Sequence, residues 1–166
     1  MNVYLYTGNG GGKTANSLGL ALRSLGHGKT VAIFQFLKWW QYTGEMMFKH
    51  PNYKIYQFGR TGWHGFDNLD DGDKWLTEQG LMYAFIEMVN NKPDLLILDE
   101  LALAVYLKLI PIEVIKGFIE YCPENTTIVI TGRHASKPLL DLADYVIEIV
   151  DVKHPKEFEC KEGIQY

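Results

Sequence analysis

A glycine-rich loop between a short apolar segment and a helical pattern constrains the fold of this chain more than any other feature. Residues 3–6 are apolar, aromatic or β-branched, which predicts a buried strand. From Lys13 onward, leucine and alanine recur at spacings of three and four residues as far as Gly26, a pattern typical of a helix that ends at a glycine. The loop between them consists of Thr7, Gly8, Asn9, Gly10, Gly11, Gly12, Lys13 and Thr14. We therefore expect the chain to open as strand, glycine loop and helix.

A loop of this kind is suited to binding phosphate. Backbone N–H groups, the positive end of the helix dipole and a lysine side chain converge on one point, and glycines leave that point accessible. The usual motif is Gly, four residues and then Gly-Lys-Ser/Thr, and Thr7 stands where its first glycine would be. We expect residues 8–14 to bind the phosphates of a nucleotide. The alternative is a glycine turn that only caps the helix.

The rest of the chain alternates between apolar segments and helical spacing. Further strands are expected at 31–36, 54–58, 95–98, 127–130 and 145–150, and helical spacing occurs at 82–89 and in 101–121 with a break near Pro111. Apolar strands separated by helices predict a mostly parallel sheet of about six strands with helices on both faces. With no repeat or linker, residues 1–166 are expected to form one α/β domain, a single-domain P-loop nucleotide-binding fold.

Composition excludes several classes of protein. The net charge of -4 provides no overall field that would attract nucleic acid or anionic lipid, so neither is expected as a partner. The longest apolar run, residues 101–107, is far shorter than the roughly 20 residues that cross a bilayer. Two cysteines, Cys122 and Cys160, are too few for a disulfide framework, and the first residues do not resemble a secretion signal. We expect a cytoplasmic protein.

Two carboxylates follow an apolar strand in the middle of the chain. Asp99 and Glu100 come directly after residues 95–98. In phosphate-loop proteins such an acid completes the shell of a magnesium ion together with the loop hydroxyl, which here belongs to Thr14. Alone, this pattern is more often a solvated strand end. Paired with the glycine loop, it favours ATP or GTP with Mg²⁺ held by Thr14 and by Asp99 or Glu100, but does not define the reaction.

Short segments along the whole chain resemble, in order and spacing, the motifs of one family. The loop at 8–14 is similar to that family's Gly-Asn-Gly-Lys-Gly-Lys-Thr, and further matches lie at 23–29, 35–38, 44–45, 98–101, 131–133, 142–144, 152–154 and 163–166. The family is the ATP-dependent corrinoid adenosyltransferases of the phosphate-loop type. Three departures stand out: Gly11 replaces a lysine, Ala15 replaces a threonine, and the chain begins directly at its first strand.

The resemblance implies an unusual use of ATP. Reduced cobalt of a corrinoid attacks the ribose 5′ carbon, and triphosphate leaves. Because Co(I) is itself a strong nucleophile, the protein needs no base, and it has only to orient the carbon and stabilise the leaving group. Lys13, the loop N–H groups and Mg²⁺ would do the latter. The resemblance also implies a corrinoid substrate, an electron-donor reductase and a homodimer.

Two aromatic residues and two arginines complete the implied site. Family members displace the lower axial ligand of cobalt with aromatic rings in a Thr-Gly-Phe-Thr-Trp segment, and residues 61–66 here place Trp63 at the Phe and Phe66 one residue from the Trp. The alternative is that both rings pin the loop to the core. Arg23 matches a family arginine near the active site, or is a solvated helix residue. Arg133, after a strand, would meet phosphate or corrin amides, or cap the site.

Other interpretations remain open at the level of sequence. The glycine loop also fits a P-loop ATPase or kinase, and the changes at Gly11 and Ala15 fit a nucleotide-dependent binding module. Residues 67–78 resemble a calcium loop, but Leu69 and Trp75 stand at ligand positions, so we expect an acidic helix start there. The adjacent tryptophans at 39–40 would either form a subunit or corrinoid contact or lie in the core.

Overall fold

The computed structural model describes residues 1–62, 65–155, 157 and 160–166. Helices and strands alternate along the chain: β1 (Asn2–Thr7), α1 (Lys13–Gly26), β2 (Val31–Phe36), α2 (Gly44–Met47), β3 (Tyr53–Phe58), α3 (Asp71–Asn91), β4 (Leu95–Asp99), α4 (Leu101–Tyr106), α5 (Ile112–Glu120), β5 (Thr127–Thr131), α6 (Lys137–Asp141) and β6 (Tyr145–Glu148). The predicted strand, glycine loop and helix at the amino end are confirmed.

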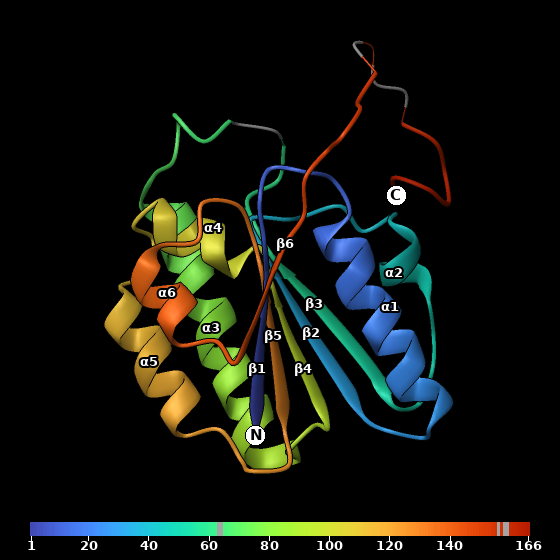
Figure 1. The fold of residues 1–166 in the computed structure, drawn as a ribbon, viewed down its shortest axis with the longest axis vertical. Coiled ribbons are helices and arrows are strands. Elements are labelled where there is room, and N and C mark those ends of the chain that lie inside the picture. Colours follow the sequence, from blue (N-terminus) through green and yellow to red (C-terminus); the bar gives the residue numbers. More distant parts are fainter. Residues whose placement is uncertain (63–64, 156, 158–159) are drawn as a thin grey trace.

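All six strands form one sheet in the order β3-β2-β4-β5-β1-β6, and every neighbouring pair is parallel. Every residue of β2 and β4 is buried, as expected for strands covered on both faces. Helices α1 and α2 lie on one side of the sheet and α3 to α6 on the other (Figure 1). The predicted α/β fold with a mostly parallel sheet is therefore confirmed.

Two apolar cores lie on opposite faces of the sheet. The larger contains Phe34, Leu98 and Ile115 and lies between the sheet and α3 to α6, and the smaller contains Ile33, Ile97 and Ala21 under α1. Alternate residues of β2 and β4 thus point into opposite cores, which anchors these central strands firmly. Among the described residues, none of the helices has both the length and the apolar character needed to span a membrane.

Several boundaries differ from the sequence prediction. The strand expected at 145–150 ends at Glu148, because the next residues leave the sheet edge and cross the glycine loop. The break predicted near Pro111 is confirmed: the helical region at 101–121 is two helices separated by residues 107–111. The acidic segment resembling a calcium loop is a helix start, as predicted: Asp70 caps α3 in a reciprocal capping box with Asp73, and Arg60 forms ion pairs with both.

The topology places the functional residues at one edge of the sheet. In a parallel sheet all carboxyl ends of the strands lie on the same edge, where ligands of α/β proteins bind. The glycine loop follows β1, Asp99 ends β4, and Thr131 ends β5. The described residues that follow β3, 59–62 and 65–70, also extend above this edge (Figure 1).

Candidate nucleotide-binding site

The glycine loop folds around its own lysine. Gly8 and Gly12 have φ of 95° and 97°, conformations that side chains rarely adopt, and Gly12 caps α1. The Lys13 ammonium donates to the carbonyl oxygens of Gly8 at 2.9 Å and Gly10 at 2.7 Å. The Lys13 side chain is buried, and this burial lowers its pKa. The loop is thus closed on itself, with its cation turned towards its own backbone.

The glycines at 8 and 10 are also required by the chain that follows β6. A Cβ on Gly10 would lie 2.7 Å from the carbonyl carbon of Val150, and one on Gly8 would collide with the carbonyl oxygen of Ile149. The Gly10 N–H donates to that same Ile149 oxygen at 2.9 Å. Close packing of two backbones therefore explains part of the glycine pattern, in addition to the phosphate access expected from the sequence.

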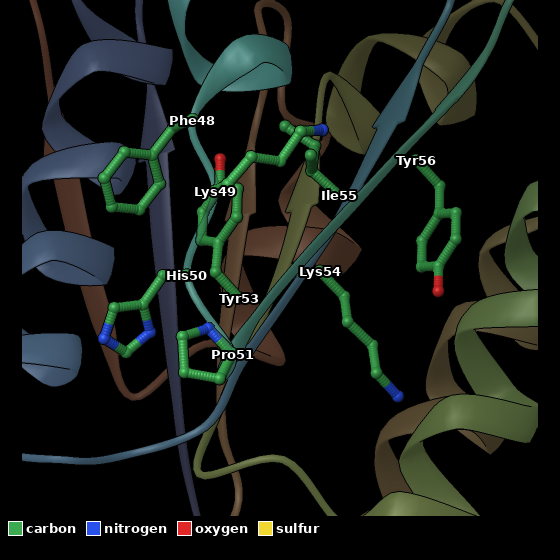
Figure 2. A pocket seen from close by; sticks show the side chains of 8 residues that line it. All are labelled: Phe48, Lys49, His50, Pro51, Tyr53, Lys54, Ile55 and Tyr56. Atoms are coloured by element: carbon green, nitrogen blue, oxygen red, sulfur yellow. The ribbon is translucent and has the colours of Figure 1, made fainter.

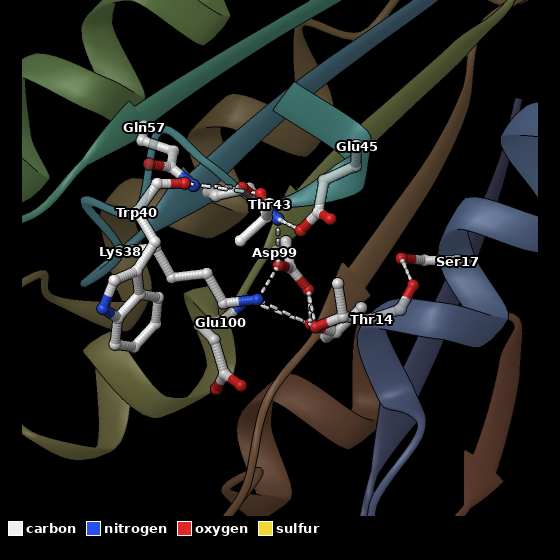
Figure 3. Close-up of polar contacts among 11 residues, drawn as sticks. Thr14, Ser17, Lys38, Trp40, Thr43, Glu45, Gln57, Asp99 and Glu100 are labelled. Atoms are coloured by element: carbon white, nitrogen blue, oxygen red, sulfur yellow. Dashed lines mark hydrogen bonds and ion pairs between the residues drawn. The ribbon is translucent and has the colours of Figure 1, made fainter. Parts of the chain in front are cut away.

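Asp99 is the centre of a buried polar cluster (Figure 3). Its Oδ1 accepts hydrogen bonds from the hydroxyls of Thr14 at 2.9 Å and Thr131 at 2.7 Å. Its Oδ2 accepts from the Lys38 ammonium at 2.6 Å and from the Gln35 amide at 3.1 Å. Burial acts to raise the pKa of this carboxyl, but the Lys38 charge and the hydrogen bonds outweigh it and lower the pKa. Asp99 is an ionised carboxylate with four donors already around it.

Lys38 is a residue of the site to which sequence reasoning assigned no role. Its ammonium lies between Asp99 and the Thr14 hydroxyl, to which it donates at 3.0 Å. Burial acts to lower the pKa of Lys38, but the Asp99 charge raises it overall, so the group stays cationic. The signal was present in the match at 35–38, but its meaning depends on β2 lying beside β4 in the sheet.

Glu100 differs from Asp99 in having an unsatisfied carboxylate oxygen. Its Oε2 is buried and has no hydrogen-bond partner among the described residues, and no dashed line reaches its carboxylate in Figure 3. Its backbone is left-handed, with φ of 62°, and its N–H donates to the Thr131 hydroxyl. Burial, and then the Asp99 charge, raise its pKa, while Lys38, Lys13 and Arg133 act to lower it. A cation would stabilise this desolvated carboxylate.

The remaining predicted residues that the structure describes lie at different distances from the glycine loop. Arg133 is exposed but close enough for its charge to act on Lys13 and Glu100. Arg23 is exposed in the last turn of α1, about 15 Å along the helix from the glycine loop, so the structure does not bring it to the loop. Phe66 is 42% exposed in the segment above the sheet edge. Trp63 lies outside the described residues, so its predicted role is not tested.

One hollow of the surface lies away from this site. A space of about 460 Å³ lies along the edge strand β3 and the segment before it, lined by Phe48, Lys49, His50, Pro51, Tyr53, Lys54, Ile55 and Tyr56 (Figure 2). It contains no residue of the glycine loop or of the Asp99 cluster, and it follows the uncovered edge of the sheet. The tryptophans at 39–40 are both half-buried, with ring centroids 6.0 Å apart, which decides neither of their predicted roles.

Taken together, the parallel sheet, the glycine loop at the start of α1 and the acid at the end of β4 define an α/β protein of the phosphate-loop type. The sequence model of one family, described as ATP:corrinoid adenosyltransferase BtuR/CobO/CobP, matches residues 2–166. The chain belongs to this family of ATP:corrinoid adenosyltransferases.

Individual relatives agree with this assignment. A corrinoid adenosyltransferase of Escherichia coli strain K12 is 32% identical over 166 residues, covering 99% of this chain and 85% of the relative. Corrinoid adenosyltransferase CobA of Salmonella typhimurium strain LT2 matches with the same identity and coverage. A corrinoid adenosyltransferase of Pseudomonas aeruginosa is 29% identical over 171 residues, covering 99% of this chain and 83% of the relative.

Proposed function

We propose that this protein transfers the 5′-deoxyadenosyl group of ATP to the reduced cobalt of a corrinoid and releases triphosphate. The observation that carries this proposal is the family match over nearly the entire chain, including a glycine loop that is formed and positioned at the sheet edge. The electron pair of Co(I) forms the new bond to the 5′ carbon, and the electrons of the broken C–O bond leave with the triphosphate. The alternatives, a P-loop ATPase or kinase and a nucleotide-dependent binding module, are not favoured by the family assignment.

In this reaction the glycine loop acts on the leaving group. The loop N–H groups and Lys13 would bind the triphosphate and stabilise the charge that it gains as it departs. Lys13 now donates to two loop carbonyls, so it has to turn outward when phosphate oxygens arrive. Arg133, whose charge already reaches this region, is a second cation for the same anion.

The residues present fit a magnesium ion. Glu100 has a buried oxygen without a partner, and the Thr14 hydroxyl lies in the same cluster, so we propose these two as its ligands. Asp99 already accepts four hydrogen bonds, and we assign it the task of holding Thr14 and Lys38 in place. Among the residues described, no group of three or more His, Cys, Asp or Glu is arranged for a metal. Magnesium needs only one or two carboxylates when substrate phosphates and water complete its shell, where it neutralises phosphate charge.

The corrinoid side of the site stays a proposal. We propose that Trp63 and Phe66, the two aromatic residues of the predicted corrinoid-covering segment, cover the lower face of the corrin ring. We also retain as proposals the homodimer, the protein that donates electrons to cobalt, and the cytoplasmic location. Both cysteines are free thiols, which is consistent with a reducing compartment.

Group transfer is tested directly with a corrinoid that has been reduced chemically to Co(I), because this bypasses the reductase. With ATP and Mg²⁺, we expect a light-sensitive adenosylcorrinoid, separated by chromatography and identified by mass. The variant for comparison is Lys13→Met, which should lower the rate strongly because the leaving triphosphate loses a cation. ADP without any cobalt–carbon product would contradict the proposal.

A further inference from the structure

The chain that follows β6 is hydrogen-bonded to the glycine loop at three points. The Ile149 N–H donates to the Thr7 carbonyl at 2.8 Å, and the Gly10 N–H donates back to the Ile149 carbonyl at 2.9 Å. The third contact is of a different kind. The Gly11 N–H donates to the side-chain Oδ1 of Asp151 at 3.0 Å. A carboxylate therefore lies on an N–H group of the loop.

This position is the one where the loop would bind phosphate. N–H groups just before a helix N-terminus attract anions, and a carboxylate oxygen satisfies such a donor much as a phosphate oxygen does. Burial lowers the pKa of Lys13 overall, and the charge of Asp151 acts against this shift, so the carboxylate lies within electrostatic reach of the loop lysine. Donors of the loop are thus satisfied within the protein: two carbonyl oxygens accept from the Lys13 ammonium, and a carboxylate oxygen accepts from the Gly11 N–H.

We propose that Asp151 is an affinity-setting residue of the nucleotide site, whose carboxylate takes the place of a phosphate oxygen on Gly11 and leaves when triphosphate binds. This inference rests on the proposed function, because it requires the loop to bind ATP. Triphosphate and a fixed carboxylate repel each other, so the Asp151 contact and the bound nucleotide exclude one another. ATP binding then includes the loss of one charge-assisted hydrogen bond.

The backbone contacts locate where the change begins. Both hydrogen bonds of Ile149 are made by backbone atoms, and Gly8 and Gly10 pack against the backbone at 149–150. These contacts do not compete with an anion and remain in place. Asp151 is exposed, so its side chain is free to swing into solvent. A rotation of this one side chain uncovers the Gly11 N–H without opening the sheet edge.

The chain departs from its family at the same point. The family motif given above has a lysine where this chain has Gly11, so one loop cation is missing. A Cβ at Gly11 would lie 3.9 Å from Asp151 Oδ1, an ordinary contact distance, so the carboxylate is a direct neighbour of the altered position. Both features weaken the attraction of the loop for polyanions.

The test compares two substitutions of Asp151 by titration calorimetry with ATP and with inorganic triphosphate. Asp151→Asn removes the charge but keeps an oxygen that accepts from Gly11, whereas Asp151→Ala removes both. We expect both ligands to bind about three- to tenfold more tightly to Asp151→Ala than to the wild type, with Asp151→Asn in between. Glu162→Gln, which removes an exposed charge from the same terminal segment, is the matched control and should leave affinity unchanged.

Each outcome has a distinct meaning. If the Asp151 variants bind ATP as weakly as the wild type or more weakly, the carboxylate is not a competitor and the inference is wrong, while the proposed function stands. An equal gain in Asp151→Asn and Glu162→Gln would show a general charge effect and would also overturn it. If the wild type and all variants bind neither ATP nor triphosphate, the proposed function itself fails.

Discussion

Replacing Lys38 by methionine leaves the buried Asp99 carboxylate without its cation. Among the described residues, Lys38 is the one basic group within ion-pair distance of Asp99, at 2.6 Å. The side chains are 16% and 1% exposed, so solvent replaces little of the lost interaction. Methionine has a similar length and keeps the apolar packing of the lysine stem. The substitution therefore isolates the charge.

The expected loss of stability follows from this burial. Removing one partner of a buried ion pair costs about 3–5 kcal/mol. Three uncharged donors, on Thr14, Thr131 and Gln35, still bind Asp99, so we expect the lower end, about 3 kcal/mol. For a domain of this size such a loss lowers the Tm by roughly 6–12 °C.

The pH dependence has a defined sign. In the wild type the pKa of Asp99 is lowered, so its contribution to stability is present above the unfolded-state pKa of about 3.9 and is lost as the pH falls through the folded pKa. Without Lys38, burial raises this pKa. The stability difference between Lys38→Met and the wild type is therefore largest near neutral pH and shrinks as the pH approaches about 4.

The measurement is urea unfolding followed by circular dichroism at several pH values, without nucleotide. Lys29→Met is the matched control, because Lys29 pairs with Asp94 where the two side chains are 57% and 36% exposed, and should cost only about 0–1 kcal/mol. A Lys38→Met variant within about 1 kcal/mol of this control at neutral pH would refute the reasoning.

Three further predictions concern other parts of the site. Burial raises the pKa of Glu100, so its ionised form costs stability at neutral pH; Glu100→Gln should raise the Tm of the nucleotide-free protein at pH 7 yet weaken Mg-ATP binding, and a lower Tm would contradict this. Gly10→Ala should destabilise by about 1–3 kcal/mol in chemical denaturation, because its Cβ would lie 2.7 Å from Val150, whereas Gly19→Ala, with open space in α1, should stabilise by about 0.5–1 kcal/mol. Equal effects would exclude the close approach. Trp63→Ala should reduce the four-coordinate Co(II) signal that Mg-ATP induces in the visible spectrum of bound corrinoid, and an unchanged spectrum would argue against a lower-face role.

Local patterns in the sequence were enough for the fold class and the glycine loop. Apolar runs such as 31–36 and 95–98 predict strands correctly because these strands are buried on both faces. The loop is recognisable because its glycines and Lys13 stand between a strand and a helix. Such signals depend only on neighbours along the chain.

Other features depend on which strands become neighbours. Lys38 reaches Asp99 only because β2 pairs with β4, and Asp151 reaches Gly11 only because β6 pairs with β1. Neither pairing is written in a local pattern. The strand expected to continue to residue 150 stops at Glu148, because the backbone at 149–150 packs on the glycine loop instead of extending the sheet.

The proposal that triphosphate departs as an intact leaving group is tested most directly by ³¹P NMR. ATP, Mg²⁺ and a Co(I) corrinoid are incubated with the protein until adenosylcorrinoid has formed, and the phosphorus spectrum identifies the phosphate product. We predict one equivalent of intact triphosphate for each adenosylcorrinoid, with no ADP. Orthophosphate and ADP as the products formed by the protein would contradict adenosyl transfer and identify the site as that of a hydrolase.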